Sequence, residues 1–481
     1  MNISTEDRPD VAAAAPRVPL TVKVAYSLGQ AAQSGGFDAA IAFVFFYYSA
    51  VLGLSGTLVG AALAVSLAFD AAVDPLVGSW SDNTRSRLGR RLPLMIVSIP
   101  LIAVSTALLF APPHGLEPVA LAAWLAVFSV AVRSFISLFN VPYIALGAEL
   151  ATDYAERTSI VVYRAVAGLL AGVFVTAIGY SYYFANGGLQ RADGYPGFGI
   201  AVAVLLAVCL SVCCLGIVRH AASLPQPEQL PGSTLRRLPG ELREIFSNAS
   251  FRVLFASAVV TFVAIGVNAS LNNHAFVFVW KIRSEQIQFI GYAYLGGILL
   301  GILGAPLLQK FIEKKYAVIV GFLLLIANWL VLQGLMLAGL YHPLGDAALA
   351  PMQLNSFVAG IGTGFVMVSY PSMMADAADE HELLYGRRRE GLYFAGLGFA
   401  GKAATGLGVM VAGVVLDLIR FPNDPTHSVL SDEIQSRLVT IWGPVPAVFA
   451  LLSLVILSAY AIGRRRHAEI TAELAKRRAL V

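Results

Sequence analysis

The feature that most constrains this chain is a series of twelve apolar runs, because a helix needs roughly 20 apolar residues to cross the ~30 Å core of a bilayer. Only 13% of the 481 residues are charged, about half of the ~25% usual in soluble domains. The sequence therefore predicts an all-α membrane protein with twelve transmembrane helices. The predicted spans are Val24–Leu52, Leu58–Trp80, Pro93–Ala111, Val119–Leu138, Ile160–Phe184, Phe198–Val218, Leu254–Trp280, Ile287–Leu308, Ala317–Leu340, Met352–Ala375, Gly391–Leu418 and Val439–Ile462.

The longest polar connection divides these spans six and six, and it is rich in Pro, Gln, Glu and Arg. Two six-helix halves around a central site are the architecture of one large transporter class. The expected organisation is a disordered cytoplasmic tail over 1–22, a first six-helix half over 23–218, a cytoplasmic linker over 219–250, a second half over 251–463 and a cytoplasmic tail over 464–481.

Basic residues outside the spans gather on one side of the predicted membrane. Clusters such as Arg85–Arg91 and Arg387–Arg389 follow even-numbered spans, whereas the connections after odd-numbered spans carry few Lys or Arg residues. Because short loops rich in these residues stay in the cytoplasm, both termini are predicted to be cytoplasmic. The expected location is the cell (inner) membrane.

Several function classes lack their signature here. No basic face with interleaved aromatic residues favours a nucleic-acid partner. The three cysteines share one apolar run, which offers neither a disulfide framework nor a metal site. The GLGFAGKA stretch that begins at Gly396 lacks the Ser or Thr and the preceding strand of a phosphate loop. An enzyme is not expected, nor any cofactor besides a coupling ion, Na⁺ or H⁺.

Two acidic residues lie inside the second span, where an ionisable side chain is costly and indicates function. Asp70 lies about twelve residues into the span, so ~18 Å deep at 1.5 Å per residue. Asp74 is one turn further on the same face, and Pro75 frees the carbonyl of Ala71 as another oxygen ligand. Two adjacent carboxylates in a low dielectric need a cation to stay ionised. We therefore predict a cation site, with a purely structural charge pairing as the alternative.

Other polar residues inside the spans are candidates for the same region. Lys402 in the eleventh span and Arg164 in the fifth are the expected basic partners of the acids. Asp38 lies in the middle of the first span. The stretch GVNASLNN is expected to interrupt the seventh span. Asn268 and Asn272 in this stretch are one turn apart. They either face a cavity or form hydrogen bonds with a neighbouring helix.

The block around Asp70, Asp74 and Pro75, followed by Gly78, Asp82 and NTRSRLGRR, resembles the glycoside–pentoside–hexuronide:cation symporters of the major facilitator superfamily. The resemblance extends over most of the chain. It includes Asn140-Val141-Pro142-Tyr143, Tyr163-Arg164, Asp376…Asp379 and Gly391…Lys402.

The resemblance implies roles position by position. Asp70 and Asp74 match the acids that bind the coupling cation, Ser137 falls where the family has a cation-site threonine, and Lys402 matches a lysine beside that site. In the solute site, Arg164 matches an arginine. Asn140 and Ser34 fall where the family has sugar-binding aspartates, and Asp38 lies one turn beyond Ser34. Two tryptophans of that site fall at Ile144 and Met367, so the cation half looks better retained than the sugar half.

The sequence thus predicts a monomeric symporter that carries a sugar or sugar-derived solute with a cation by alternating access. The expected solute wall consists of Asp38, Ser34, Asn140, Arg164, Asn268, Asn272 and Tyr370. Charged clusters either close the cytoplasmic side or only set topology; the gate candidates are Arg85, Arg90, Arg157, Asp376 and Arg388. The alternatives are a carrier of a lysophospholipid-like amphiphile on the same fold, and a membrane enzyme or sensor, for which no sequence signature is visible.

Overall fold

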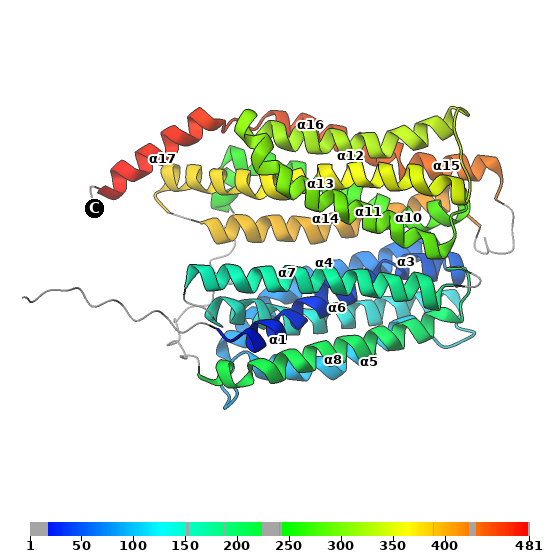
Figure 1. Cartoon of the computed structure of the whole chain (residues 1–481), viewed down its shortest axis with the longest axis horizontal. Coiled ribbons are helices and arrows are strands. Elements are labelled where there is room, and N and C mark those ends of the chain that lie inside the picture. Colours follow the sequence, from blue (N-terminus) through cyan, green and yellow to red (C-terminus); the bar gives the residue numbers. More distant parts are fainter. Residues whose placement is uncertain are drawn as a thin grey trace, which may run out of the picture.

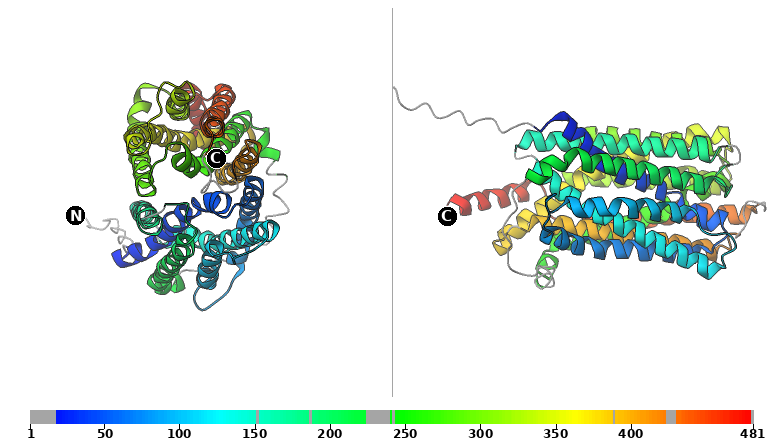
Figure 2. Two further views of the ribbon diagram at one scale, coloured as in Figure 1. Left: turned by 90° about the vertical axis from the view of Figure 1, so that its right-hand side faces the viewer. Right: turned by 90° about the horizontal axis from the view of Figure 1, so that it is seen from below.

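A computed structural model of the chain describes residues 18–150, 153–185, 188–223, 240, 243–387, 389–422 and 430–479. Twelve of its helical segments are long and apolar enough to cross a membrane, which confirms the predicted number of spans. Seen along the bundle axis, the helices form two groups, one above the other (Figure 2). The first group consists of α1 (Leu20–Gln30), α2 (Asp38–Ile41), α3 (Val44–Phe46), α4 (Gly56–Asn83), α5 (Leu92–Phe110), α6 (Pro118–Leu150), α7 (Tyr154–Ile178) and α8 (Gly194–Ser223).

The second group begins at α10, which Asn248 caps by accepting a hydrogen bond from the Phe251 amide. It consists of α10 (Ala249–His274), α11 (Ser284–Phe311), α12 (Lys314–Leu337), α13 (Asp346–Tyr385), α14 (Glu390–Leu418), α15 (Asp432–Trp442) and α16 (Pro444–Ser458). The described chain starts and finishes at the same end of the bundle (Figure 1). We call this the terminal end and the opposite one the distal end.

Several boundaries differ from the prediction. The helices α6 and α13 run well past Leu138 and Ala375, because helical structure continues through polar residues that a hydropathy window leaves out. The seventh span is not interrupted at GVNASLNN, since α10 is helical through His274 and continues as a π-helical turn to Val279. The predicted C-terminal tail contains a helix, α17 (Arg464–Ala479), which buries Ile470 and Leu474.

The last span is divided at Gly443, and its sequence explains the break. Pro444 and Pro446 have no amide hydrogen, so the helical hydrogen bond from residue 446 to the carbonyl of Trp442 cannot form. A free carbonyl inside a membrane protein needs another donor. The side-chain amide of Asn268 on α10 supplies it at 2.8 Å.

The first span is also irregular. Two π-helical turns, Ala31–Phe37 and Tyr47–Val51, interrupt its α-helical geometry, and such turns are frequent at functional sites. Asp38 follows the first of them directly.

Helices α4 and α14 join the two halves through backbone contact. A Cβ atom built on Gly413 of α14 would lie 2.0 Å from the carbonyl oxygen of Gly56 on α4, and one built on Gly60 would lie 2.9 Å from the carbonyl oxygen of Val409. Small residues allow this approach in membrane proteins. The contact brings the middle of α14, with Lys402, against the middle of α4, with the two acids.

We predict that Gly413→Ala lowers the melting temperature of the detergent-purified protein, whereas Gly398→Ala on the same helix leaves it unchanged or raises it. Alanine stabilises a helix by ~1 kcal/mol relative to glycine. A lower melting temperature of Gly413→Ala would therefore come from the disturbed contact between the two helices and not from helix propensity. A Cβ on Gly398 has no atom within 4 Å. Equal melting temperatures for the two variants would contradict the close α4–α14 contact.

Candidate cation and solute site

A lysine from one half bridges two carboxylates of the other half at the centre of the bundle. The ammonium nitrogen of Lys402 on α14 lies 2.9 Å from an oxygen of Asp70 and 2.5 Å from an oxygen of Asp74 on α4. The side chain of Asp70 is 11% exposed, whereas those of Asp74 and Lys402 are 34% and 37% exposed. The group is therefore only partly buried, with Asp70 as its most buried member. The acids and the lysine that the sequence singled out are brought together.

Ser137 joins the same group from α6. Its hydroxyl donates a hydrogen bond of 2.6 Å to the second oxygen of Asp70, so both oxygens of this carboxylate have a partner. Helix α4 is unbroken through Pro75, and proline leaves the carbonyl of Ala71 without its helical donor. Two carboxylates, one hydroxyl and one carbonyl are oxygen ligands of the kind that hard cations prefer.

Arg133 is a charged residue of this region that the sequence reasoning missed. It lies on α6 one turn before Ser137, and its guanidinium carbon is 5.6 Å from the centre of the Phe37 ring. Its Nε atom is buried and donates to no acceptor in the described part of the chain. The signal was present in the sequence, since Arg133 is an arginine inside the predicted fourth span.

Asp38 lies at the start of α2, and its side chain is exposed. The carboxylate of Asp38, halfway along the first span, therefore does not lie in the packed core.

A second polar cluster forms around Arg164 on α7. Its guanidinium donates a 2.6 Å hydrogen bond to the side chain of Gln30 and lies 4.9 Å from the ring centre of Tyr143. The Gln30 amide also donates to the hydroxyl of Ser34 at 3.1 Å. Gln30, which the sequence reasoning did not select, thus connects two predicted solute residues.

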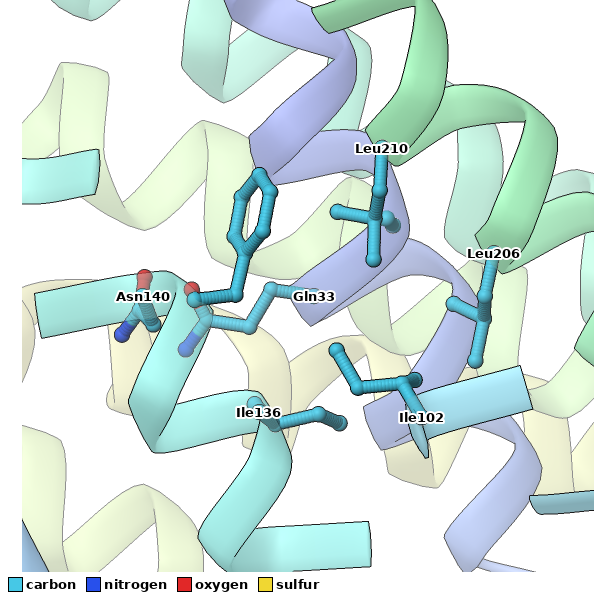
Figure 3. Close-up of a pocket in the computed structure, with 8 residues that line it drawn as sticks. Gln33, Ile102, Ile136, Asn140, Leu206 and Leu210 are labelled. Atoms are coloured by element: carbon cyan, nitrogen blue, oxygen red, sulfur yellow. The ribbon is translucent and has the colours of Figure 1, made fainter. Parts of the chain in front are cut away.

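Asn140 lies beside a small cavity inside the first half. The cavity is lined by Ala32, Gln33, Ile102, Ile136, Phe139, Asn140, Leu206 and Leu210. The Gln33 side-chain amide extends towards Asn140 in Figure 3. The side-chain oxygen of Asn140 is buried and accepts no hydrogen bond within the described chain, so an acceptor is free for a donor that enters here.

The predicted solute residues of the second half have protein partners. Asn268 donates to the Trp442 carbonyl, and Asn272 accepts a 2.8 Å hydrogen bond from the Trp442 indole. Tyr370 is buried and donates to the carbonyl of Leu254. The contacts of Asn268 and Asn272 are the interhelical hydrogen bonds that the sequence left open as an alternative. None of the three residues contacts the Asp70 group through a hydrogen bond that the structure describes.

The charged clusters at the terminal end form ion pairs within each half. Arg90 and Arg91 both bind Glu149, at 2.5 and 3.1 Å. Asp376 pairs with Lys314 at 2.8 Å. Among the other gate candidates, Arg85 is exposed and Arg157 lies near the start of α7, whereas Arg388 is outside the described residues. The ion pairs named here do not cross between the halves.

At the distal end, hydrogen bonds do cross between the halves. The buried His274 ring is 3.0 Å from the hydroxyl of Ser49, and Tyr180 donates to Asn273 at 2.9 Å. The carboxylate of Asp417, near the end of α14, accepts the backbone amides of Gly56 and Thr57 at 2.8 Å each. This carboxylate caps α4, whose first amides have no helical acceptor.

Comparison with known proteins identifies the family. A family model described as MFS/sugar transport protein matches residues 25–464. The chain belongs to this family. It is therefore a multi-pass membrane transporter rather than an enzyme, as the sequence predicted.

Relatives and solved structures agree with this family. The inner membrane symporter YicJ of Escherichia coli is 25% identical, over 91% of each chain. The isoprimeverose transporter of Lactiplantibacillus pentosus is 24% identical, over 83% of this chain and 80% of the relative. An inward-open structure of the E. coli xylose transporter XylE has a TM-score of 0.61 at 15% identity and covers 94% of this chain and 99% of its own.

We predict that Ser137→Ala raises the cation concentration needed for half-maximal uptake several-fold, because Asp70 loses its hydroxyl partner and a cation loses an oxygen ligand. Ser129→Ala on the same helix is the matched control, since its buried hydroxyl has no partner in the described structure. Uptake into proteoliposomes is measured against Na⁺ concentration and against pH. Identical ion dependence in the two variants would contradict the placement of Ser137 in the site.

Proposed function

We propose that this transporter couples solute entry to a cation that binds Asp70 and Asp74 and displaces the ammonium group of Lys402. The observation that carries the proposal is the bridge of Lys402 to both carboxylates across the two halves. A monovalent cation on the acids competes with the lysine for the same oxygens. Cation binding therefore weakens an attractive contact between α4 and α14. The same contact must change when the transporter switches the side of the membrane to which its site is open.

The contacts at the two ends of the bundle support the proposal that this state is open towards the terminal end. Hydrogen bonds between Ser49 and His274, from Tyr180 to Asn273 and from the Gly56 amide to Asp417 join the halves at the distal end. The ion pairs of Arg90 and Asp376 stay within their own halves. Half-exposed Asp74 and Lys402 agree with a cleft that water enters. If the basic terminal end is cytoplasmic, this state faces inward and is poised to release solute and ion into the cell.

The solute in this proposal is a sugar or a sugar derivative. The relative that is named an isoprimeverose transporter supports this class. In the first half, Asp38, Arg164 with Gln30 and Ser34, and Asn140 with its free acceptor supply hydrogen-bonding groups for hydroxyls. Asn268, Asn272 and Tyr370 stay predictions, and a contact with solute would require their present partners to be exchanged.

The coupling cation in this proposal is Na⁺ or H⁺. Two carboxylates and a hydroxyl suit Na⁺ as oxygen ligands, and a carboxylate of the pair equally accepts a proton. In the described residues, no group of three or more His, Cys, Asp or Glu side chains is assembled as a metal site.

We predict that Asp74→Asn abolishes ion-driven accumulation of solute while the protein still folds and inserts. Asparagine keeps the size of the side chain but removes the charge that attracts the cation. Purified protein in proteoliposomes is first screened with sugars, sugar acids and a lysophospholipid, with and without Na⁺ and at several pH values. The best solute is then used for the variant.

The control is Asp193→Asn, since this aspartate is 82% exposed in a surface ion pair with Arg191. Retained accumulation in Asp74→Asn would overturn the proposed cation site. If the protein takes up the lysophospholipid but no sugar, its solute is an amphiphile and not a sugar.

A further inference from the structure

Arg164 is a charged side chain whose described contacts are all with neutral groups. Its guanidinium donates a hydrogen bond to the side-chain oxygen of Gln30 at 2.6 Å. The guanidinium carbon lies 4.9 Å from the ring centre of Tyr143 and 5.8 Å from that of Tyr26. In the described part of the chain, Arg164 forms no ion pair with an acid. Its positive charge therefore lacks a counter-charge within ion-pair distance there.

The guanidinium also has donors that the protein does not use. A guanidinium presents five N–H donors in a planar fork, which matches a carboxylate. The side chain of Arg164 is only half-buried, and its Nε atom donates to no acceptor in the described residues. Gln30, which accepts from the fork, donates in turn to Ser34 at 3.1 Å. The fork is thus held in place by neutral partners, and an anion is the group that would satisfy both its charge and its remaining donors.

The charges in the middle of the described spans balance one another when the site is empty. They are the acids Asp38, Asp70 and Asp74 and the bases Arg133, Arg164 and Lys402. The ion pair of Asp376 with Lys314 lies at the terminal end and is neutral by itself. Binding of one monovalent cation leaves one positive charge in excess, and an uncompensated charge inside a membrane protein is costly. A solute with one negative charge removes this excess, whereas a neutral sugar does not.

We propose that the solute is a sugar derivative with one negative charge, on a carboxylate or a sulfonate, and that this group binds Arg164. The proposal rests on the proposed function, because it names the substrate class of the same site. The hydroxyls of the solute bind neutral groups of the first half, such as Asn140 with its free side-chain acceptor. Transport of one cation together with one such anion moves no net charge across the membrane.

The first test compares sugar acids with uncharged counterparts of the same shape. The full-length protein is titrated at neutral pH in NaCl with glucuronate and with glucuronamide, and binding is measured from the melting temperature. Glucuronate should bind at a roughly tenfold lower concentration, because hydrogen bonds to a charged group are stronger. Galacturonate with its amide covers a second ring, and glucose sulfonated at C6, compared with glucose, covers the sulfonate. Neutral compounds that bind as tightly as the acids, or acids that all fail to bind, would overturn the proposal.

Variants of the arginine test where the anion binds. Arg164→Gln should remove the preference for glucuronate over glucuronamide, since the positive charge is gone. Arg164→Lys keeps the charge but not the fork, so it should bind glucuronate more weakly and glucuronamide unchanged. The control is Arg437→Gln, because this arginine has a 48% exposed side chain and pairs with Glu433 on the same helix.

A preference for the acid that survives in Arg164→Gln would contradict the assignment to Arg164. The same holds for a preference that is lost in Arg133→Gln instead, since Arg133 is the other arginine in the middle of these spans. If Arg164→Gln does not purify as a folded protein, the separate effects of Arg164→Lys on glucuronate and on glucuronamide decide the question.

The second test measures the charge that is transported. In proteoliposomes that contain potassium, valinomycin sets an inside-negative membrane potential. Ion-driven uptake of the sugar acid should proceed at the same initial rate with and without this potential, because the cation and the monoanion cancel. Uptake of the acid that the potential accelerates would overturn the charge balance.

A failure of this inference is distinguishable from a failure of the proposed function. If sugars bind in an ion-dependent way that Asp74→Asn abolishes, but the acids have no advantage over their neutral counterparts, only the anionic class is wrong. If neither Na⁺ nor H⁺ affects the binding of any solute, and Asp74→Asn behaves as native, the cation coupling itself is wrong.

Discussion

The contact between Lys402 and the two carboxylates of α4 is the interaction on which the rest of the structure depends. Charges in a membrane interior are expensive unless they are paired or reach water. Removing one partner from a buried ion pair leaves an uncompensated charge that is strongly destabilising. The lysine belongs to one half and the acids to the other, so the same electrostatic requirement that stabilises the fold also links the halves. A cation that satisfies the acids can take over this role.

The packing of α4 against α14 makes the contact possible. Backbone contact at Gly56, Gly60 and Gly413 brings the two helix axes close enough for Lys402 to reach both acids. The same two helices are joined near their distal ends, where Asp417 caps α4. Charge pairing in the middle, glycine contacts beyond it and a cap at the end form one continuous seam between the halves.

Much of the cation site could be predicted from the sequence, because charged residues inside apolar runs are rare and their cost indicates a function. Asp70, Asp74 and Lys402 were selected on this ground, and the structure places them in direct contact. The resemblance added Ser137, which proves to be bonded to Asp70. The number of spans followed from hydropathy alone, whereas their ends did not, since α6 and α13 continue through polar residues.

Other features depend on which helices become neighbours, and a single sequence does not contain this information. Gln30 and Glu149 are ordinary polar residues until folding brings Arg164 and the Arg90–Arg91 pair against them. Asn268 gains its partner because Pro446, far away in the sequence, leaves the Trp442 carbonyl without a helical donor. Arg133 is a different case, because the sequence alone could have identified it. It is a charged residue inside an apolar span, so the energetic cost that points to a function for Asp70 points to one for Arg133 as well.

The central claim, that the coupling cation and the Lys402 ammonium compete for the same oxygens, is tested most directly by cation binding to the Lys402→Gln variant. The measurement is the cation concentration that gives half of the maximal thermal stabilisation, compared with the native protein and with Lys402→Arg. Competition predicts that Lys402→Gln binds the cation at a lower concentration and that Lys402→Arg does not. An unchanged or higher concentration for Lys402→Gln would contradict the account.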